Sequence, residues 1–307
     1  MTARESVKNY PSALREMTNY SVRGIKKICK EADSRTPGSD NENKAQKILE
    51  TELSECCDDV KEECFKARKD TKVFLILGVI FAVAAIGLML AKVTIIGGFC
   101  AGVALVLIVV PFLLPQAEAT YLYGIKNAVD TAQKRIVLLA NYDCVKKSEG
   151  AGNNLSGCYS ALSVVRFMQR QKLDLNNTEV WIVLTSADTM NMAGTLHFAK
   201  NHKFDDIETI FISLDSIVNP DAISAFYADD TAKSAVENAS KLTDKKLAST
   251  AKASEAKAIA ATGAHFAKLS ACNKGDITGN DSADKLNLRA IESVVDVLLE
   301  TTFALEK

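Results

Sequence analysis

Two stripes of apolar residues at helical spacing open the chain. One stripe runs through residues 1–33 and a second through about residues 40–54, so each segment is predicted to be an amphipathic helix. Arg35-Thr36-Pro37-Gly38-Ser39 lies between them and predicts a turn, because Pro and Gly interrupt helices and Ser39 is suited to cap the second one. We expect a short strand at Val60–Lys66 to follow.

Two long apolar runs come next. Residues 73–91 and residues 93–114 carry no charged side chain, and Lys92 stands alone between them. A helix needs about 20 apolar residues to cross a hydrocarbon core of about 30 Å, so the runs predict a hairpin of two membrane-spanning helices. The alternative is a pair of buried core helices. We expect the small residues Gly98 and Gly102 to pack against the first span, and homodimerisation through them stays open.

Basic residues set the expected orientation of this hairpin. Those that precede the first span are Lys61, Lys66, Arg68, Lys69 and Lys72. Because basic residues favour the cytoplasmic side and the turn holds only Lys92, the N-terminal segment is expected in the cytoplasm. A hairpin returns the chain to the same side. We therefore predict an integral membrane protein with both termini and the soluble domain cytoplasmic, in agreement with eight scattered cysteines that show no CxxC spacing.

Segments typical of strands and helices alternate after the hairpin. Strands are expected at residues 122–129, 136–140, 180–185, 207–214 and 265–270, and helices at residues 155–171, 194–201 and 286–305. The Ala- and Lys-rich segment 229–262 is interpreted as exposed helix. The alternation predicts an α/β fold, a three-layer sandwich whose mixed, mostly parallel twisted sheet is covered by helices on both faces. The hairpin is inserted into this domain, so its N-terminal part, the hairpin and its main part are residues 1–70, 71–116 and 117–307.

Composition excludes some functions. A net charge of −1 over 307 residues is not that of a nucleic-acid-binding protein, which normally presents a basic face. Gly150-Ala151-Gly152 is not followed by Gly-Lys-Ser/Thr, so a phosphate loop is not expected. A cysteine nucleophile at Cys144 or Cys158 would need a nearby histidine, and His197 and His202 are interpreted as solvated side chains at a helix end.

The most informative segment runs from residue 135 to residue 157. Its buried strand ends in Asn141-Tyr142-Asp143, which places polar side chains at the carboxyl end of a strand, where open α/β sheets keep their sites. The loop Gly150-Ala-Gly-Asn-Asn-Leu-Ser-Gly157 follows. Together these segments resemble the two-zinc aminopeptidases, whose strand ends in His-x-Asp and whose loop has the form Gly-Ala-x-Asp-Asn-x-Ser-Gly. The Arg-Thr-Pro-Gly-Ser turn resembles the family's Arg-x-Pro-Gly-Ser. The family includes bacterial leucyl aminopeptidase, aminopeptidase Y and transferrin receptor-like domains.

The resemblance implies a site for two metal ions, but most ligand positions have changed. Two cations about 3.5 to 4 Å apart need a bridging carboxylate and terminal imidazole or carboxylate ligands. The first His position falls on Asn141, the bridging Asp on Asn153, a ligand Glu on Thr189 and the late His on Ile277. Only Asp215 keeps a metal-binding side chain at a ligand position.

Two further positions carry carboxylates. The resemblance places Asp188 where the family has its catalytic Glu base, one methylene longer, and keeps Asp143 as the carboxylate that supports the first ligand. Because neutral amides and a hydroxyl cannot offset two dications, we expect no bound cofactor in place of the family's two zinc ions. Because the family's motifs keep their order and spacing, we predict instead a catalytically inactive, membrane-anchored scaffold. The cleft at the position of the family's active site is expected to bind a peptide or a partner protein.

Two alternatives stay open. One is an active metal-dependent aminopeptidase whose single Mg²⁺ or Mn²⁺ is held by Asp143, Asp188 and Asp215, since carboxylates without imidazole suit these ions better than zinc. The other makes the hairpin the functional part, as a small subunit of a membrane complex.

Overall fold

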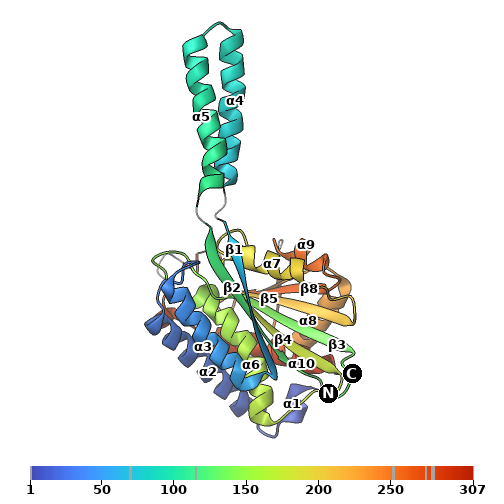
Figure 1. The fold of residues 1–307 in the computed structure, drawn as a ribbon. Coiled ribbons are helices and arrows are strands. Elements are labelled where there is room, and N and C mark those ends of the chain that lie inside the picture. The colour runs from blue at the N-terminus through green and yellow to red at the C-terminus, as the bar shows by residue number, and fades with distance from the viewer. Residues whose placement is uncertain are drawn as a thin grey trace. The chain divides into compact units, whose positions relative to one another are not determined.

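The computed structural model describes residues 2–68, 71–114, 116–250, 253–273, 275–277 and 281–306. Its helices are α1 (Ala3–Ser6), α2 (Tyr10–Glu31), α3 (Asp40–Cys56), α4 (Lys72–Leu90), α5 (Thr94–Leu113), the π-helix η1 (Ala151–Leu155), α6 (Ser156–Gln171), α7 (Ala193–Asn201), α8 (Asp230–Leu242), α9 (Ala256–Ala260), the 3₁₀ helix η2 (Ala283–Lys285) and α10 (Leu288–Ala304) (Figure 1). Its strands are β1 (Asp59–Ala67), β2 (Ala117–Lys126), β3 (Lys134–Asn141), β4 (Thr178–Thr185), β5 (Glu208–Ile217), β6 (Ile223–Tyr227), β7 (Ala248–Ser249) and β8 (His265–Ala271).

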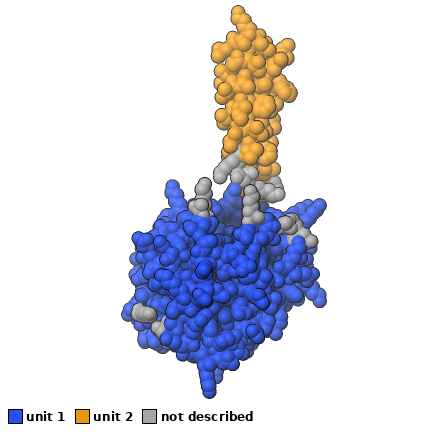
Figure 2. All heavy atoms as spheres, turned by 180° about the vertical axis from the view of Figure 1, so that it is seen from behind, with its two compact units in different colours: residues 1–65, 119–307 blue, residues 66–118 orange. Residues whose placement is uncertain are grey.

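The chain divides into two compact units (Figure 2). The larger combines residues 1–65 with residues 119–307, and the smaller comprises residues 66–118. The smaller unit therefore interrupts the larger one in sequence, between β1 and β2. Lys69, one of the basic residues that set the expected orientation, lies outside the described residues.

The larger unit is built on one eight-stranded sheet with the order β1-β2-β4-β3-β5-β8-β6-β7. Its centre is parallel, because β3 pairs in parallel with both β4 and β5, and β5 pairs in parallel with β8. Strands β2 and β6 are antiparallel to their neighbours β4 and β8. The predicted mixed, mostly parallel α/β sheet is thus confirmed.

Alternating side chains of the central strands bury both faces of the sheet. Ile136, Leu138 and Ala140 of β3 belong to the main core, which they share with α2, α3, α6, α8 and α10. Val137 and Leu139 lie on the opposite face and are just as buried. Helices α7 and α9 cover that second face (Figure 1). Strands buried on both sides explain the continuous apolar run at residues 136–140.

The smaller unit is a pair of packed helices. Both α4 and α5 are long and apolar enough to cross a membrane, and only 11% and 17% of their spans is buried inside the structure. They approach closely at glycines: a Cβ on Gly78 would lie 2.8 Å from Ile108 Cγ1, and one on Gly97 would lie 2.9 Å from Met89 Cγ. The expected contact of Gly98 and Gly102 with the first span is wrong, since a Cβ on either would meet nothing within 4 Å.

Several predicted elements differ from those observed. The strand expected at residues 122–129 is β2, which begins earlier and ends at Lys126. Strands β6 and β7 were not predicted, and the segment interpreted as exposed helix holds α8, β7 and α9. Strand β6 has only five residues and follows Pro220 closely, although Ile223, Phe226 and Tyr227 are residues that favour strands.

Candidate functional site

Polar side chains converge in one pocket at the carboxyl ends of β3, β4 and β5. Because β3 runs parallel to both neighbours, these ends meet at the same edge of the sheet. The pocket encloses about 230 Å³ and is lined by Leu139, Ala140, Asn141, Asn153, Asp188, Thr189, Met192, Thr195, Ser213, Leu214, Asp215, Glu255 and Lys268. We call it the strand-end pocket. Five of the predicted positions line it: Asn141, Asn153, Asp188, Thr189 and Asp215.

Asp143 is completely buried beside this pocket and organises the turn after β4. Its Oδ1 accepts hydrogen bonds from Asn141 Nδ2 at 3.0 Å and from the backbone N–H of Asp188 at 3.2 Å. Its Oδ2 accepts from Thr189 twice, from the backbone N–H at 2.9 Å and from Oγ1 at 2.6 Å. Both oxygens are therefore engaged by the protein's own donors, which fix Asn141, Asp188 and Thr189 relative to one another.

The carboxylate of Asp188 is held in the same way. Oδ2 accepts hydrogen bonds from Thr185 Oγ1 at 2.8 Å and Thr195 Oγ1 at 2.6 Å, and Oδ1 accepts from the backbone N–H of Thr195 at 2.9 Å. Thr195 lies in the first turn of α7, so Asp188 also places a negative charge at a helix N-terminus. Burial, followed by the charge of Asp143, raises the pKa of Asp188 to about 6 although these hydrogen bonds oppose the shift.

Two asparagine amides meet at the back of the pocket. Asn154 Nδ2 donates to Asn141 Oδ1 at 3.2 Å and to the carbonyl of Leu214 at 2.6 Å. Because Asn141 also donates to Asp143, its amide has partners on both sides. Asn153 differs, since no hydrogen bond joins its exposed side chain to another of the described residues. Its amide is therefore available to a ligand.

The glycine loop before α6 is anchored by a buried aspartate. Asp281 accepts hydrogen bonds from the backbone N–H groups of Gly152 and Asn153, each at 2.8 Å. A Cβ on Gly152 would lie 2.4 Å from Val218 Cγ1 and 2.9 Å from Asp281 Oδ1, so the loop needs glycine here. Only a residue without a side chain allows this close approach.

Asp215 is paired with a lysine. Lys268 Nζ lies 2.8 Å from Asp215 Oδ2 and 3.2 Å from Glu255 Oε1. Burial acts to raise the pKa of Asp215, but the Lys268 ammonium outweighs it and holds that pKa below its usual value. Burial likewise acts to lower the pKa of Lys268, but the carboxylates of Asp215 and Glu255 raise it above its usual value. Asp215 and Lys268 are therefore both charged at neutral pH.

Ile277 does not line the strand-end pocket. It lines a smaller cavity of about 20 Å³ together with Gly152, Val218, Asp276, Asp281, Ser282, Lys285 and Leu286. The side chain is apolar and offers no donor to a metal ion. Residues 278–280, which follow it, lie outside the described residues.

Arg35 ties the N-terminal turn to the site loops. The residue is fully buried, and its guanidinium donates to the carbonyls of Tyr142 and Glu149 at 2.7 Å each and of Gly150 at 3.1 Å. Its backbone N–H donates to Cys144 Sγ at 3.0 Å. Arginine suits this position because its planar fork presents several fixed donors, which a lysine lacks. The turn thus fixes the loop that leaves β3.

The thiol–histidine alternative is not supported by the geometry. Cys144 and Cys158 are buried, and burial raises the pKa of both thiols, which disfavours the nucleophilic thiolate. His197 stacks on Phe65 at 4.7 Å and His202 stacks on Phe198 at 4.3 Å between ring centroids. The interpretation of these histidines as solvated is wrong, because both are half-buried among aromatic rings.

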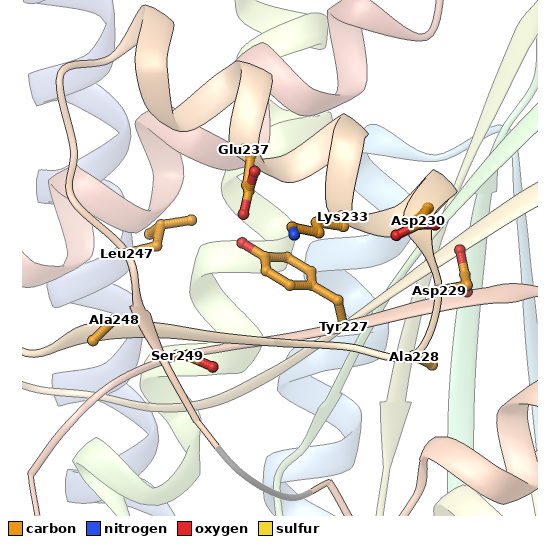
Figure 3. A pocket seen from close by; sticks show the side chains of 9 residues that line it. All are labelled: Tyr227, Ala228, Asp229, Asp230, Lys233, Glu237, Leu247, Ala248 and Ser249. Atoms are coloured by element: carbon orange, nitrogen blue, oxygen red, sulfur yellow. The ribbon is translucent and has the colours of Figure 1, made fainter.

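A second cavity, of about 390 Å³, lies between the end of β6 and α8 (Figure 3). Its walls are Tyr227, Ala228, Asp229, Asp230, Lys233, Glu237, Leu247, Ala248 and Ser249. The Tyr227 hydroxyl points toward Glu237, and burial together with this carboxylate raises the pKa of Tyr227 to about 12. It shares no lining residue with the strand-end pocket and contains none of the predicted positions.

The comparison with known families now has a structural basis. The model of Peptidase family M28 matches residues 124–302. The chain belongs to peptidase family M28. This membership confirms the resemblance drawn from Asn141-Tyr142-Asp143 and the glycine loop. No curated protein sequence matches the chain.

Solved structures similar to this M28 chain include zinc aminopeptidases. BSAP, a zinc aminopeptidase from Bacillus subtilis, superposes with a TM-score of 0.69 at 13% identity, covering 94% of this chain and 95% of that one. An aminopeptidase from Aneurinibacillus sp. strain AM-1 gives 0.71 at 13% identity, covering 95% of each chain. A glutaminyl cyclase from an Acidobacteriales bacterium gives 0.68 at 13% identity, covering 94% of each. At this identity the likeness shows a common fold.

The donor set of this M28 chain does not fit a pair of zinc ions. Two amides and a hydroxyl stand at three of the carried-over ligand positions, and the carboxylate of Asp215 is paired with Lys268. Within the described ranges, no group of three or more His, Cys, Asp or Glu side chains is gathered so that it could hold a metal ion. Asp143, Asp188 and Asp215, the ligands of the alternative magnesium or manganese site, form no such group.

Sequence analysis did not identify Lys268 or Glu255. One signal was available, since Lys268 is the only Asp, Glu, Lys or Arg in the strand His265–Ala271. A charged residue inside a central parallel strand needs a partner. Glu255 gave no signal, because it lies in a segment rich in Ala, Lys and Ser.

Proposed function

We propose that this chain is a membrane-anchored M28 domain that binds the amino-terminal end of a peptide or partner protein without cleaving it. The observation that carries the proposal is the engagement of each carboxylate at the site by the protein's own donors. Asp143 accepts four hydrogen bonds, Asp188 accepts three, and Asp215 is paired with an ammonium group. A pocket organised in this way is preformed for binding and offers no pair of free carboxylates to a metal.

Size and charge favour one terminal residue as the occupant. The strand-end pocket, at 230 Å³, is smaller than the roughly 300 to 1,000 Å³ typical of small-molecule sites. Asp188, Asp215 and Glu255 line it against the single cation Lys268, so its wall is net negative at neutral pH. A positively charged amino terminus complements this charge, and the free amide of Asn153 can bond the first peptide group.

Anchoring rests on α4 and α5, which are long and apolar enough to span a bilayer. The basic residues Lys61, Lys66 and Arg68 precede α4, and Lys92 alone lies in the turn. This distribution favours a cytoplasmic larger unit, so the proposed ligand is a cytoplasmic peptide or protein.

An active metal-dependent aminopeptidase is the second candidate. The observation that favours it is the raised pKa of Asp188, about 6, which suits a general base near neutral pH. Family M28 is a family of peptidases, and its fold is that of the zinc aminopeptidases described above.

The two candidates are separated by measuring binding and hydrolysis on the full chain in detergent micelles. We expect a fluorescent peptide with a free amino terminus to bind, its N-acetylated form to bind about tenfold more weakly, and neither to be cleaved with Zn²⁺ or Mn²⁺ added. Asp215→Asn should weaken binding of the free peptide, whereas Asp221→Asn, an exposed carboxylate outside the pocket, should not. Cleavage that disappears in Asp215→Asn but not in Asp221→Asn would establish the second candidate instead.

A further inference from the structure

The cation in the strand-end pocket is supplied by the chain itself. Lys268 comes from β8, which pairs in parallel with β5 so that Lys268 lies opposite Ser213 and Asp215 opposite Ser270. Its ammonium contacts Asp215 from β5 and Glu255 from the segment before α9. The side chain of Glu255 is 1% exposed and that of Lys268 is 18% exposed, so this pair is largely removed from water.

Two carboxylates at such a place require a cation. Glu255 Oε1 also accepts a hydrogen bond from Ser213 Oγ at 2.9 Å, and Asp215 Oδ1 accepts one from Ser216 Oγ at 2.7 Å. Hydroxyl donors alone do not compensate the buried carboxylate of Glu255, which has lost its hydration and is repelled by the neighbouring, partly exposed carboxylate of Asp215. The ammonium therefore satisfies an electrostatic requirement that would exist here whatever the source of the positive charge.

The fold and the site geometry indicate different sources for this positive charge. The fold is that of zinc aminopeptidases, and Asp215 is the one carried-over ligand position that keeps a carboxylate. In this chain the same carboxylate is bound to Lys268 Nζ. A metal ion and an ammonium group cannot share the space in contact with Asp215 Oδ2.

We propose that the Lys268 ammonium holds the place of a metal ion as a tethered cation, and that removing it converts Asp215 and Glu255 into a site for a free divalent cation. Two carboxylates, a hydroxyl and water are hard oxygen ligands, so the cation is of the Mg²⁺ or Mn²⁺ class rather than zinc. Lys268 thereby makes the pocket independent of metal supply. The inference rests on the proposed function only in that it assigns the wild-type pocket no metal.

The test compares Mn²⁺ binding to the full chain and its Lys268→Met variant, purified in detergent without added metal. Methionine keeps much of the lysine stem's volume and removes the charge. We expect the variant to bind Mn²⁺ at least about tenfold more tightly than wild type, measured by the loss of the free Mn²⁺ electron paramagnetic resonance signal. Lys233→Met removes an exposed lysine at the second cavity and should change nothing.

Folding of the variant is followed by thermal unfolding with and without Mn²⁺. A variant that unfolds at lower temperature without the ion and regains stability with it supports the proposal, since the ion then replaces the lost ammonium. Lys268→Met combined with Glu255→Gln removes one carboxylate and should lose the gained affinity.

Three outcomes would overturn the proposal. They are an unchanged Mn²⁺ affinity and unfolding temperature in Lys268→Met, tight Mn²⁺ binding at this pocket in the wild type, and equal Mn²⁺ affinity in the single and double variants. A Lys268→Met chain that is destabilised and that Mn²⁺ does not stabilise counts equally against the proposal. None of these results bears on whether wild type cleaves peptides, which the hydrolysis assay decides separately.

Discussion

The ammonium of Lys268 lies 2.8 Å from Asp215 Oδ2, although 53 residues of sequence separate the two. Parallel pairing of β5 and β8 brings them together at the strand ends. The contact joins the one carboxylate retained at a carried-over ligand position to a cation that the sequence pattern of the family does not include. It explains why the site stays charged although the family's other ligand positions carry two amides, a hydroxyl and the apolar side chain of Ile277.

Replacing Arg35 should destabilise the larger unit strongly. Arg35→Met leaves the carbonyls of Tyr142, Glu149 and Gly150 without their buried donor, and hydrogen bonds to a charged group contribute about 1.5 to 3 kcal/mol each. We expect a loss of about 3 kcal/mol or more in the free energy of unfolding, measured by urea denaturation in detergent. Arg170→Met, whose side chain is 60% exposed, should change it by less than about 0.5 kcal/mol. Equal effects would show that the loop does not depend on Arg35.

Neutralising Asp143 should lower the pKa of Asp188. After burial, the charge of Asp143 is the largest cause that raises this pKa to about 6. In Asp143→Asn the repulsion disappears, so Asp188 should ionise at lower pH, as measured by the ¹³C shift of its labelled carboxyl group. Because Asp188 contributes to the negative wall that is proposed to attract the peptide's amino terminus, the pH below which peptide binding weakens should also fall. A pKa that stays in place would show that burial alone sets it.

Glu42 predicts a specific loss of stability as the pH rises. This glutamate is 2% exposed, its Oε1 has no hydrogen-bond partner, and burial raises its pKa to about 8. A carboxyl whose pKa is raised in the folded state contributes stability below its unfolded pKa of 4.5, and this contribution is lost as the pH rises through about 8. Glu42→Gln keeps an acceptor for the backbone N–H of Gly38. It should raise the free energy of unfolding by roughly 2 to 4 kcal/mol at pH 8 and leave it nearly unchanged at pH 4. A parallel pH dependence in the two proteins would contradict this account.

Removing the hairpin should release a folded soluble domain. Strands β1 and β2 are neighbours in the sheet, so a short Gly-Ser linker can replace residues 68–116 (Figure 1). We expect the shortened chain to leave the membrane fraction, unfold cooperatively and keep the peptide affinity of the full chain. Gly98→Ala in the full chain is the matched control, because its Cβ would meet nothing within 4 Å and membrane association should persist. Loss of peptide binding on deletion would favour the hairpin as the functional part.

The site could be predicted where its residues match the pattern of the family. Asn141 and Asp143 end an apolar strand and Asn153 lies in a recognisable glycine loop, and the resemblance extended the site to Asp188, Thr189 and Asp215. Lys268 and Glu255 reach the same pocket through the pairing of β5 with β8 and through a long connection. A contact of this kind depends on the whole sheet order, which local periodicity does not encode.

The packing of the two hairpin helices shows the same limit of prediction from sequence. Its two spans follow directly from apolar length, and both helices are observed. The face on which they pack was predicted from Gly98 and Gly102, but Gly97 makes the contact. Adjacent residues of a helix point about 100° apart, so the correct face depends on the rotation of the helix, which composition leaves free.

The central claim is that this M28 pocket acts without a metal ion, and the metal content of the full chain tests it most directly. The chain is purified in detergent without chelator, exposed to excess Zn²⁺ and desalted, and its bound metal is measured by inductively coupled plasma mass spectrometry. The account predicts well under one metal ion per chain, both in the wild-type protein and in its Asp215→Asn variant. Close to two zinc ions per chain, lost on Asp215→Asn, would contradict it.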